Sequence, residues 1–187
     1  MTLPTMTSNG LQRDCVQAMR LIGFDPGLRN TGWGVVDTQG NHLCYVADGT
    51  VRPRINQDLA SRLRELYEAL AEVLDTYAPE EAAVEESFVS RNFGSTLKLG
   101  QARGVVLLAP ALFGISVAEY SANRVKKSVV GVGHADKRQI QLMVTRLLPG
   151  CQFSSADSAD ALAVAICHAH FSTTLQRLAD SKHEQVQ

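Results

Sequence analysis

The chain lacks a long apolar segment, since no run of hydrophobic residues approaches the ~18 that a transmembrane helix needs. Its first twenty residues contain polar and acidic positions and no apolar core, unlike a secretory signal. The four cysteines are scattered and form no C-x-x-C pair. These absences disfavour a membrane partner, a zinc knuckle and a disulfide framework, and they predict a protein of the reducing cytoplasm.

The sequence also lacks internal repeats, low-complexity tracts and a marked net charge, which is −1 over 187 residues. A hydrophobic fraction of 45% and a charged fraction of 20% suit one domain with a full core. We expect the compact domain at residues 19–171, after a flexible leader at residues 1–18 and before a polar C-terminal tail at residues 172–187.

The near-zero net charge hides a strong segregation along the sequence. Residues 57–86 carry nine acids and two arginines, a balance of −7. Residues 87–146 carry nine basic residues and two acids, a balance of +7. A segregated basic half is typical of a protein that binds a polyanion, although charges that merely sort along a solvated surface would give the same pattern.

The most informative stretch is residues 21–37, LIGFDPGLRNTGWGVVD. Two β-prone runs flank a turn rich in Pro, Gly and Asn, which predicts two strands joined by a tight connection. Asp25 then lies at the carboxyl end of a buried strand. An Asp before Pro-Gly also commonly starts a turn by bonding its own backbone, so this stretch alone leaves a structural and a functional role open.

Hydrophobic periodicity extends this pattern along the chain. It predicts strands at residues 20–25, 31–38, 42–52, 82–85 and 115–120, and helices at residues 58–77, 96–112, 124–130, 135–148 and 156–170. The first three strands are expected to be antiparallel, and the last two alternate with helices. The predicted fold class is therefore α/β, a mixed five-stranded sheet flanked by helices.

Acidic side chains are expected to converge at one end of this sheet. Asp25 and Glu85 end two strands, and they face each other if those strands are parallel neighbours. Asp157 and Asp160 are three residues apart on one helix face; Asp157 can be explained as a helix cap or a charge on the helix dipole. Asp160 has no basic residue within a turn or two, so a hard cation such as Mg²⁺ or Mn²⁺ is a suitable partner.

Five motifs together resemble the RuvC-type Holliday-junction resolvases, a family of the RNase H-like nuclease superfamily. They are GFDPGLRNTGWG at 23–34, AVEESF at 83–88, LKLGQARG at 97–104, VKKSVVGVGHADK at 125–137 and ADSADALAVAI at 156–166. The resemblance implies that Asp25, Glu85, Asp157 and Asp160 are the catalytic, metal-binding acids, with two Mg²⁺ ions for which Mn²⁺ can substitute. It further implies a homodimer that nicks two strands of like polarity in a four-way DNA junction, in partnership with the RuvA–RuvB branch-migration complex.

The DNA-binding residues are expected in the basic half and its polar loop. The candidates are Phe88, Arg91, Arg103, Arg124, Lys126, Lys127, His134 and Lys137. The resemblance implies lysines near DNA at Lys126 and Lys137. Phe88 can stack on an unpaired base or anchor the loop to the core. His134 can bond a phosphate or simply flank a helix, and His168 and His170 are expected to serve the dipole and solvation of the last helix.

Two other functions remain as alternatives. A nucleotide-binding module of the actin and Hsp70 type also opens with a strand, an Asp and a Gly turn, but it needs a second, repeated half. A catalytically silent junction-binding protein of the same fold is disfavoured by the four acids. The helix at residues 96–112 has more apolar surface than one face on a sheet requires, which predicts that it forms much of a dimer interface.

Overall fold

The computed structural model describes residues 18–86 and 93–184, with side chains described up to residue 172. Its sheet has the strand order β3-β2-β1-β4-β5. The strands are β1 (Met19–Asp25), β2 (Thr31–Gln39), β3 (His42–Val51), β4 (Glu81–Glu86) and β5 (Ser116–Ser121). Strands β1, β2 and β3 are antiparallel, whereas β4 is parallel to β1 and to β5. The predicted mixed α/β sheet is confirmed.

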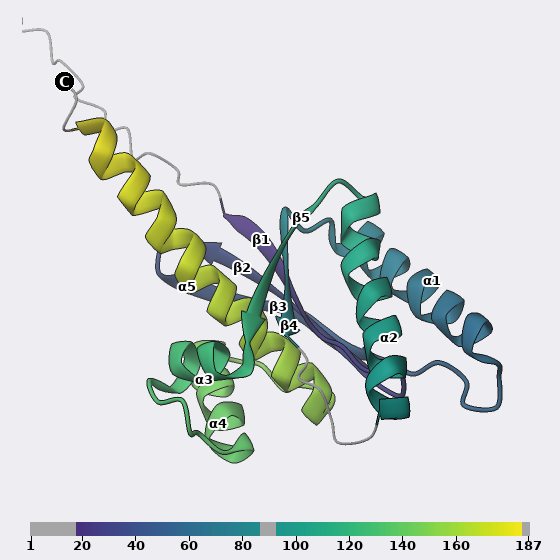
Figure 1. The fold of residues 1–187 in the computed structure, drawn as a ribbon. Helices are drawn as coiled ribbons and strands as arrows, with labels where there is room; N and C mark the ends of the chain where they lie inside the picture. Colours follow the sequence, from purple (N-terminus) through teal and green to yellow (C-terminus); the bar gives the residue numbers. More distant parts are fainter. Residues whose placement is uncertain (1–17, 87–92, 185–187) are drawn as a thin grey trace, which may run out of the picture.

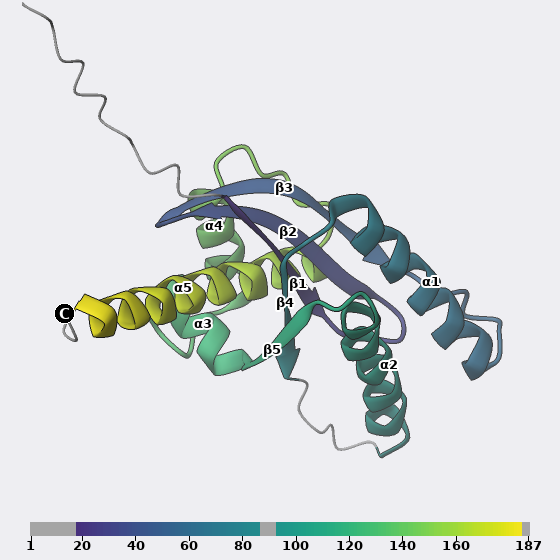
Figure 2. The ribbon, with the colours of Figure 1, turned by 90° about the horizontal axis from the view of Figure 1, so that it is seen from above.

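The helices form a layer on each side of the sheet (Figures 1 and 2). They are α1 (Leu59–Tyr77), α2 (Phe93–Leu112), α3 (Ala122–Val130), α4 (Lys137–Leu147) and α5 (Ala156–Glu184). Helices α1 and α2 pack on one face, and α5 covers the other face with α3 and α4 beside it. Within residues 18–86 and 93–184, no helix combines the length and the apolar character needed to cross a membrane.

Strand β1 is the centre of the sheet and is buried on both faces. Its alternating side chains enter two separate cores: Leu21 packs with α3, α4 and α5, and Ile22 packs with α1 and α2. A strand flanked by helices on both faces has a continuous apolar run, which explains why residues 21–24 were recognisable in the sequence.

The two largest differences from the predicted helix boundaries are at the start of α2 and the end of α5. Helix α2 begins at Phe93 rather than at residue 96, and α5 continues to Glu184 rather than ending at residue 170. Residues 171–184 contain no proline or glycine, so nothing in the backbone stops the helix even though the composition becomes polar. Polarity was mistaken for a helix end, and the segment expected to be a tail is largely helical.

Glycines in β1 and β2 allow α5 to lie directly on the sheet. A Cβ added at Gly23 would overlap the backbone of Ala161 and Ala165 in α5. A Cβ at Gly32 would overlap the backbone of Asp157. This close approach needs small residues on both sides, which the alanines of α5 provide. The contact fixes the first turns of α5 against the ends of β1 and β2, where the acidic residues gather.

Candidate active site

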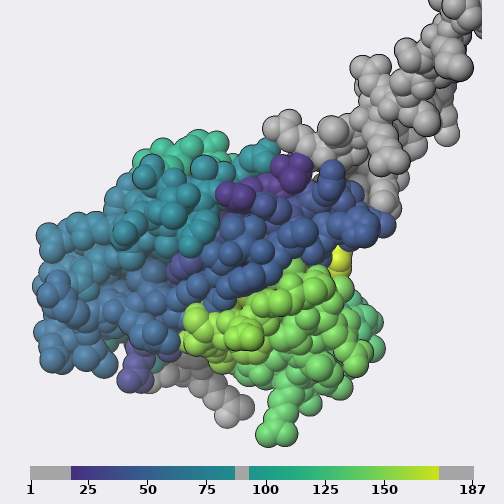
Figure 3. Space-filling model, turned by 180° about the vertical axis from the view of Figure 1, so that it is seen from behind, coloured from purple at the N-terminus to yellow at the C-terminus, as the bar shows by residue number. Residues whose placement is uncertain are grey.

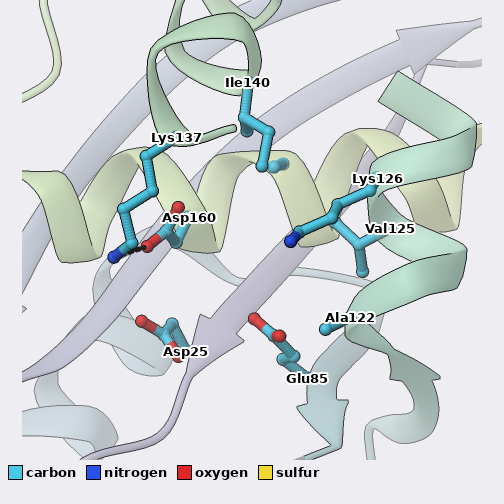
Figure 4. Close-up of a pocket in the computed structure, with 9 residues that line it drawn as sticks. Asp25, Glu85, Ala122, Val125, Lys126, Lys137, Ile140 and Asp160 are labelled. Carbon is cyan, nitrogen blue, oxygen red and sulfur yellow. Dashed lines mark hydrogen bonds and ion pairs between the residues drawn. The ribbon is translucent and has the colours of Figure 1, made fainter. Parts of the chain in front are cut away.

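Parallel pairing of β1 and β4 places two carboxylates side by side. The last paired residues are Phe24 and Val84, and the next residue in each strand is an acid, Asp25 or Glu85. Both side chains line a pocket of about 280 Å³ (Figure 4). The predicted convergence of these two strand ends is therefore present in the structure.

Helices α4 and α5 close the same pocket from the other side. Asp160 lines it, and Lys137 Nζ lies 3.2 Å from Asp160 Oδ2. Lys126 of α3 approaches from a third direction (Figure 4). Asp160 thus has a basic partner that the sequence did not reveal, because Lys137 comes from a different helix, 23 positions away in the chain. Asp157 is outside the lining residues of the pocket.

The carboxylates raise one another's pKa. The pKa of Asp25 is raised to about 8. Burial is the largest cause of this shift, and the negative charges of Glu85, Asp160 and Asp157 raise the pKa further. Burial and then Asp160 also raise the pKa of Glu85, although Lys126 and Lys137 oppose this shift. When all three lining acids are ionised, the pocket holds more negative charge than its two lysines compensate.

The residues present fit a divalent cation by their chemistry. All four acids offer hard oxygen ligands, which suit Mg²⁺ or Mn²⁺. Yet among the described residues no three acidic, histidine or cysteine side chains already form a tight ligand cage. Lys137 already pairs with Asp160, and like charge opposes a closer approach of the ionised carboxylates, which a bound cation would offset.

Strand β3 holds the start of α5 in place. Asp48 Oδ2 accepts hydrogen bonds from the Ser154 backbone N–H at 2.8 Å and from Ser154 Oγ at 2.7 Å. Its Oδ1 accepts one from Tyr45 Oη at 2.7 Å, and Thr50 Oγ1 lies 2.6 Å from Ser155 Oγ. In Figure 3 the light green segment before α5 lies directly against the blue surface of β3. Sequence analysis missed Asp48, because its partner is 106 residues away.

Helix α5 is capped by a serine rather than by Asp157. Ser155 Oγ accepts a hydrogen bond from Ser158 N at 3.0 Å, and Ser158 Oγ accepts one from Ser155 N at 3.0 Å. Asp157 lies in the first turn, where its charge still complements the helix dipole. Of the two explanations for Asp157, the structure supports the charge on the helix dipole and gives the cap to Ser155, so the Asp157 carboxylate remains available for another role.

The predicted DNA contacts occupy different surroundings. Lys126 and Lys137 line the pocket, whereas Lys127 and His134 are exposed outside it. Phe88 and Arg91 lie outside the described residues. Two of the predicted DNA-binding residues, Lys126 and Lys137, therefore lie beside the acidic residues of the pocket.

Two predicted DNA-binding arginines already have partners within the chain. Arg103 of α2 forms an ion pair with Glu119 of β5. The guanidinium of Arg124 lies 4.0 Å from the ring centroid of Phe171 and 5.4 Å from that of Tyr120. Both contacts have a structural explanation, so a DNA role for either arginine stays a prediction.

His168 contradicts its sequence interpretation. It was expected to serve the dipole and solvation of the last helix, but it is only 7% exposed. Its Nε2 lies 2.9 Å from Glu81 Oε2, and its Nδ1 lies 2.9 Å from Tyr120 Oη. The helix continues past this position, so the residue is in the middle of α5 rather than near its end.

The family model of the crossover junction endodeoxyribonuclease RuvC matches residues 21–168. A protein of this name from Paramagnetospirillum magneticum is 58% identical over 161 residues, covering 86% of this chain and 97% of that protein. Another, from Bradyrhizobium diazoefficiens, is 60% identical over 152 residues, covering 81% and 87%.

Solved structures give the same result. The Thermus thermophilus RuvC structure in complex with a Holliday junction substrate has a TM-score of 0.78 and 33% identity, covering 83% of this chain and 96% of that one. The yeast mitochondrial Holliday junction resolvase Ydc2 has a TM-score of 0.63 at 11% identity, covering 89% and 86%, which shows a shared fold.

Proposed function

Because this chain belongs to the RuvC family of crossover junction endodeoxyribonucleases, we propose that Asp25, Glu85, Asp157 and Asp160 form the catalytic centre with which it cuts DNA. The chain is an endonuclease that resolves Holliday junctions, and its family is divalent-metal dependent. The observation that carries the assignment of the site is the meeting of Asp25, Glu85 and Asp160 in one pocket with Lys126 and Lys137.

The residues of this pocket suit phosphodiester hydrolysis. When bound, two Mg²⁺ or Mn²⁺ ions supply an activated water and stabilise the leaving oxygen. The charges of Glu85, Asp160 and Asp157 all act on Asp25, so Asp25 would be the central metal ligand and the other three acids would complete the set of ligands. Lys126 and Lys137 offer positive charge to the scissile phosphate at the pocket mouth. No side-chain nucleophile is required.

A cleavage assay tests this centre directly. A synthetic four-way junction should be cut in Mg²⁺ or Mn²⁺ and left intact in EDTA, and a duplex of the same sequence should be cut far more slowly. Binding without cleavage under every metal condition would favour the catalytically silent alternative. Binding of ATP with no affinity for the junction would favour the actin-type alternative.

We further propose a homodimer, since resolution needs two matched nicks. Helix α2 carries exposed apolar side chains: Leu97 is 66%, Leu108 52% and Leu112 61% exposed. Leu108→Glu should therefore give a folded monomer by sedimentation that loses paired nicking of a plasmid cruciform. Leu142 of α4, 54% exposed, is the matched control, and Leu142→Glu should stay dimeric. A monomeric wild type at micromolar concentration with junction bound would refute the dimer.

The remaining assignments follow from the family and the sequence. We propose that residues 19–171 are the nuclease domain, with a leader before it and, after it, a C-terminal segment in which α5 continues to Glu184; the family match to residues 21–168 supports this division. Deleting residues 1–18 should leave the melting temperature and cleavage unchanged. Action in the cytoplasm together with the RuvA–RuvB complex is a proposal that pull-down on junction-bound RuvA–RuvB would test.

A further inference from the structure

A second pocket, of about 300 Å³, lies between the β1–β2 turn and the first turns of α1 and α2. Three separate segments each contribute one cation to it: Arg29 from the turn, Arg62 from α1 and Lys98 from α2. Of the residues that the structure describes, no carboxylate lines the pocket. Three positive charges around one cavity repel each other, and this arrangement favours an anionic occupant.

The acids near this pocket in the chain are engaged elsewhere. Asp58 accepts hydrogen bonds from Ser61 N and Ser61 Oγ and so caps α1. Glu65 pairs with Arg54 and accepts its backbone N–H at 2.9 Å. Among the described residues, neither Arg29 nor Lys98 forms an ion pair, so the positive charge of the pocket is left for a ligand.

Arg62 is held in position before any ligand binds. Its Nη2 donates a hydrogen bond to the Leu28 carbonyl at 2.9 Å, which ties α1 to the β1–β2 turn. Its Nε is buried and has no hydrogen-bond partner among the described atoms. Buried donors normally find an acceptor. The Nε is closed to solvent, so an anion in the pocket would interact with the positive charge of the Arg62 guanidinium, which its bond to Leu28 holds in place.

The rest of the pocket is apolar. Leu28 is buried, Leu99 is half-buried, and Ile55 is 62% exposed although it is a large aliphatic side chain. An apolar wall beside a cationic one suits a phosphodiester with its attached sugar better than it suits a bare inorganic anion. The chemistry therefore indicates a nucleotide unit.

The position of the pocket points to the substrate strand. Arg29 follows Asp25 by four residues, so their Cα atoms are at most about 14 Å apart. We propose that the pocket formed by Arg29, Arg62 and Lys98 holds a phosphodiester of the junction DNA a few nucleotides from the scissile phosphate. This inference rests on the proposed function, because it takes the bound polyanion to be the junction.

Salt titration of junction binding tests the proposal, with EDTA present to prevent cleavage. The variants are Arg29→Ala, Lys98→Ala and their double variant. Arg64→Ala is the matched control, since Arg64 lies on α1 but pairs with Glu68 and does not line the pocket. The slope of log K against log salt should fall by about 0.9 for each phosphate interaction that a variant removes, and the control should keep the wild-type slope.

Methylphosphonate substitution then locates the bound phosphate. Each methylphosphonate neutralises one phosphate of the junction. At the phosphate that the pocket holds, neutralisation should weaken binding by the wild-type protein but should not weaken binding by the double variant, which has already lost the contact. Unchanged melting temperatures would confirm folding, since Arg29 and Lys98 are exposed. A wild-type slope and an unaltered phosphate profile in the double variant would overturn the proposal. Wild-type binding of a free deoxynucleoside monophosphate that is lost in the double variant, with junction binding unchanged, would assign the pocket to a free nucleotide instead. Cleavage by the wild-type protein is scored separately and tests only the proposed function.

Discussion

Strand β4 carries a glutamate at each end, and the two meet opposite surroundings. Glu81, at the amino end, lies 2.9 Å from the buried His168, which also contacts Tyr120. Glu85, at the carboxyl end, faces Asp25 and Asp160. Helix α5 contributes a neighbour to each of these two glutamates. Its Asp160 lies near Glu85 and its His168 near Glu81, and the two α5 residues are eight positions, or about 12 Å, apart along the helix axis.

The comparison separates a stabilising end from a functional one. At the amino end a carboxylate lies beside a histidine and a tyrosine, and Glu81 partly offsets the effect of burial on His168. At the carboxyl end like charges are gathered, and burial raises the pKa of Asp25 to about 8. Such an arrangement lowers stability until a cation and a phosphate bind, which is typical of an active site rather than of a structural network.

The largest expected effect is the loss of cleavage when an acid at the carboxyl end of β4 is replaced. Glu85→Gln should lower the single-turnover cleavage rate of a four-way junction by at least ~10³-fold, because losing even a residue that only hydrogen-bonds a metal ligand costs about 10- to 100-fold. Junction binding should change only a few-fold. The measurement is cleavage at saturating protein in Mg²⁺.

The neighbouring residue is the control for this prediction. Glu86 is exposed and alternates to the other face of β4, so Glu86→Gln should cut like the wild type. An inactive Glu86→Gln with an active Glu85→Gln would mean that the strand register is displaced by one residue.

A smaller loss should follow from loosening α5 at β3. Asp48→Ala removes the hydrogen bonds to Ser154 and Tyr45, so the α5 acids lose their fixed position. We expect cleavage to slow by about 10- to 100-fold and the Mg²⁺ midpoint to rise. Burial alone would raise the pKa of Asp48, but its hydrogen bonds hold that pKa below its usual value, so this stabilisation should disappear only in acid.

Asp37→Ala is the matched control for Asp48→Ala. Asp37 makes a two-pronged ion pair with Arg20, at 2.8 and 3.0 Å, at the opposite end of the sheet. Its loss should lower the melting temperature and leave the rate of the folded protein unchanged. Equal losses of rate in both variants would show that Asp48 acts only through stability.

The sequence allowed the sheet and the strand-end acids to be predicted because their signals are local. The apolar run before Asp25 and the run before Glu85 each mark a buried strand, and parallel neighbours must end at the same edge. Partners distant in the chain were not predictable. Lys137 bonds Asp160 from another helix, and Asp48 bonds Ser154 from β3, so both contacts depend on tertiary packing that no periodicity encodes.

A third prediction tests the repulsion at the carboxyl end through stability. The raised pKa of Asp25 means that the native state binds a proton which the unfolded state has lost between about pH 4 and pH 8. Stability should therefore fall as pH rises from about 4 to about 8 in EDTA and level off above pH 8. Asp25→Asn should remove most of this fall, leaving the smaller part that the raised pKa of Glu85 causes, and should melt higher than the wild type at pH 8. Mg²⁺ should stabilise the wild type more than the variant. Identical melting curves in EDTA would refute the electrostatic account.

The smallest expected effect is at the amino end, where the pH dependence should have the opposite sign. Burial lowers the pKa of His168, and Glu81 only partly opposes this shift. The unfolded state then binds a proton that the native state does not, so stability is complete above about pH 6.5 and declines as pH falls below it. His168→Gln should flatten that decline between pH 7 and pH 5, at a cost of about 1 kcal/mol at pH 7. The melting series is best run in the Asp25→Asn background, which removes most of the opposing slope. His170→Gln is measured beside it because burial also lowers the pKa of His170. In an otherwise wild-type chain, His168→Gln should cut junctions at the normal rate. Superimposable pH profiles would show that His168 titrates alike in both states, and a loss of cleavage would show that the two ends of α5 are not independent.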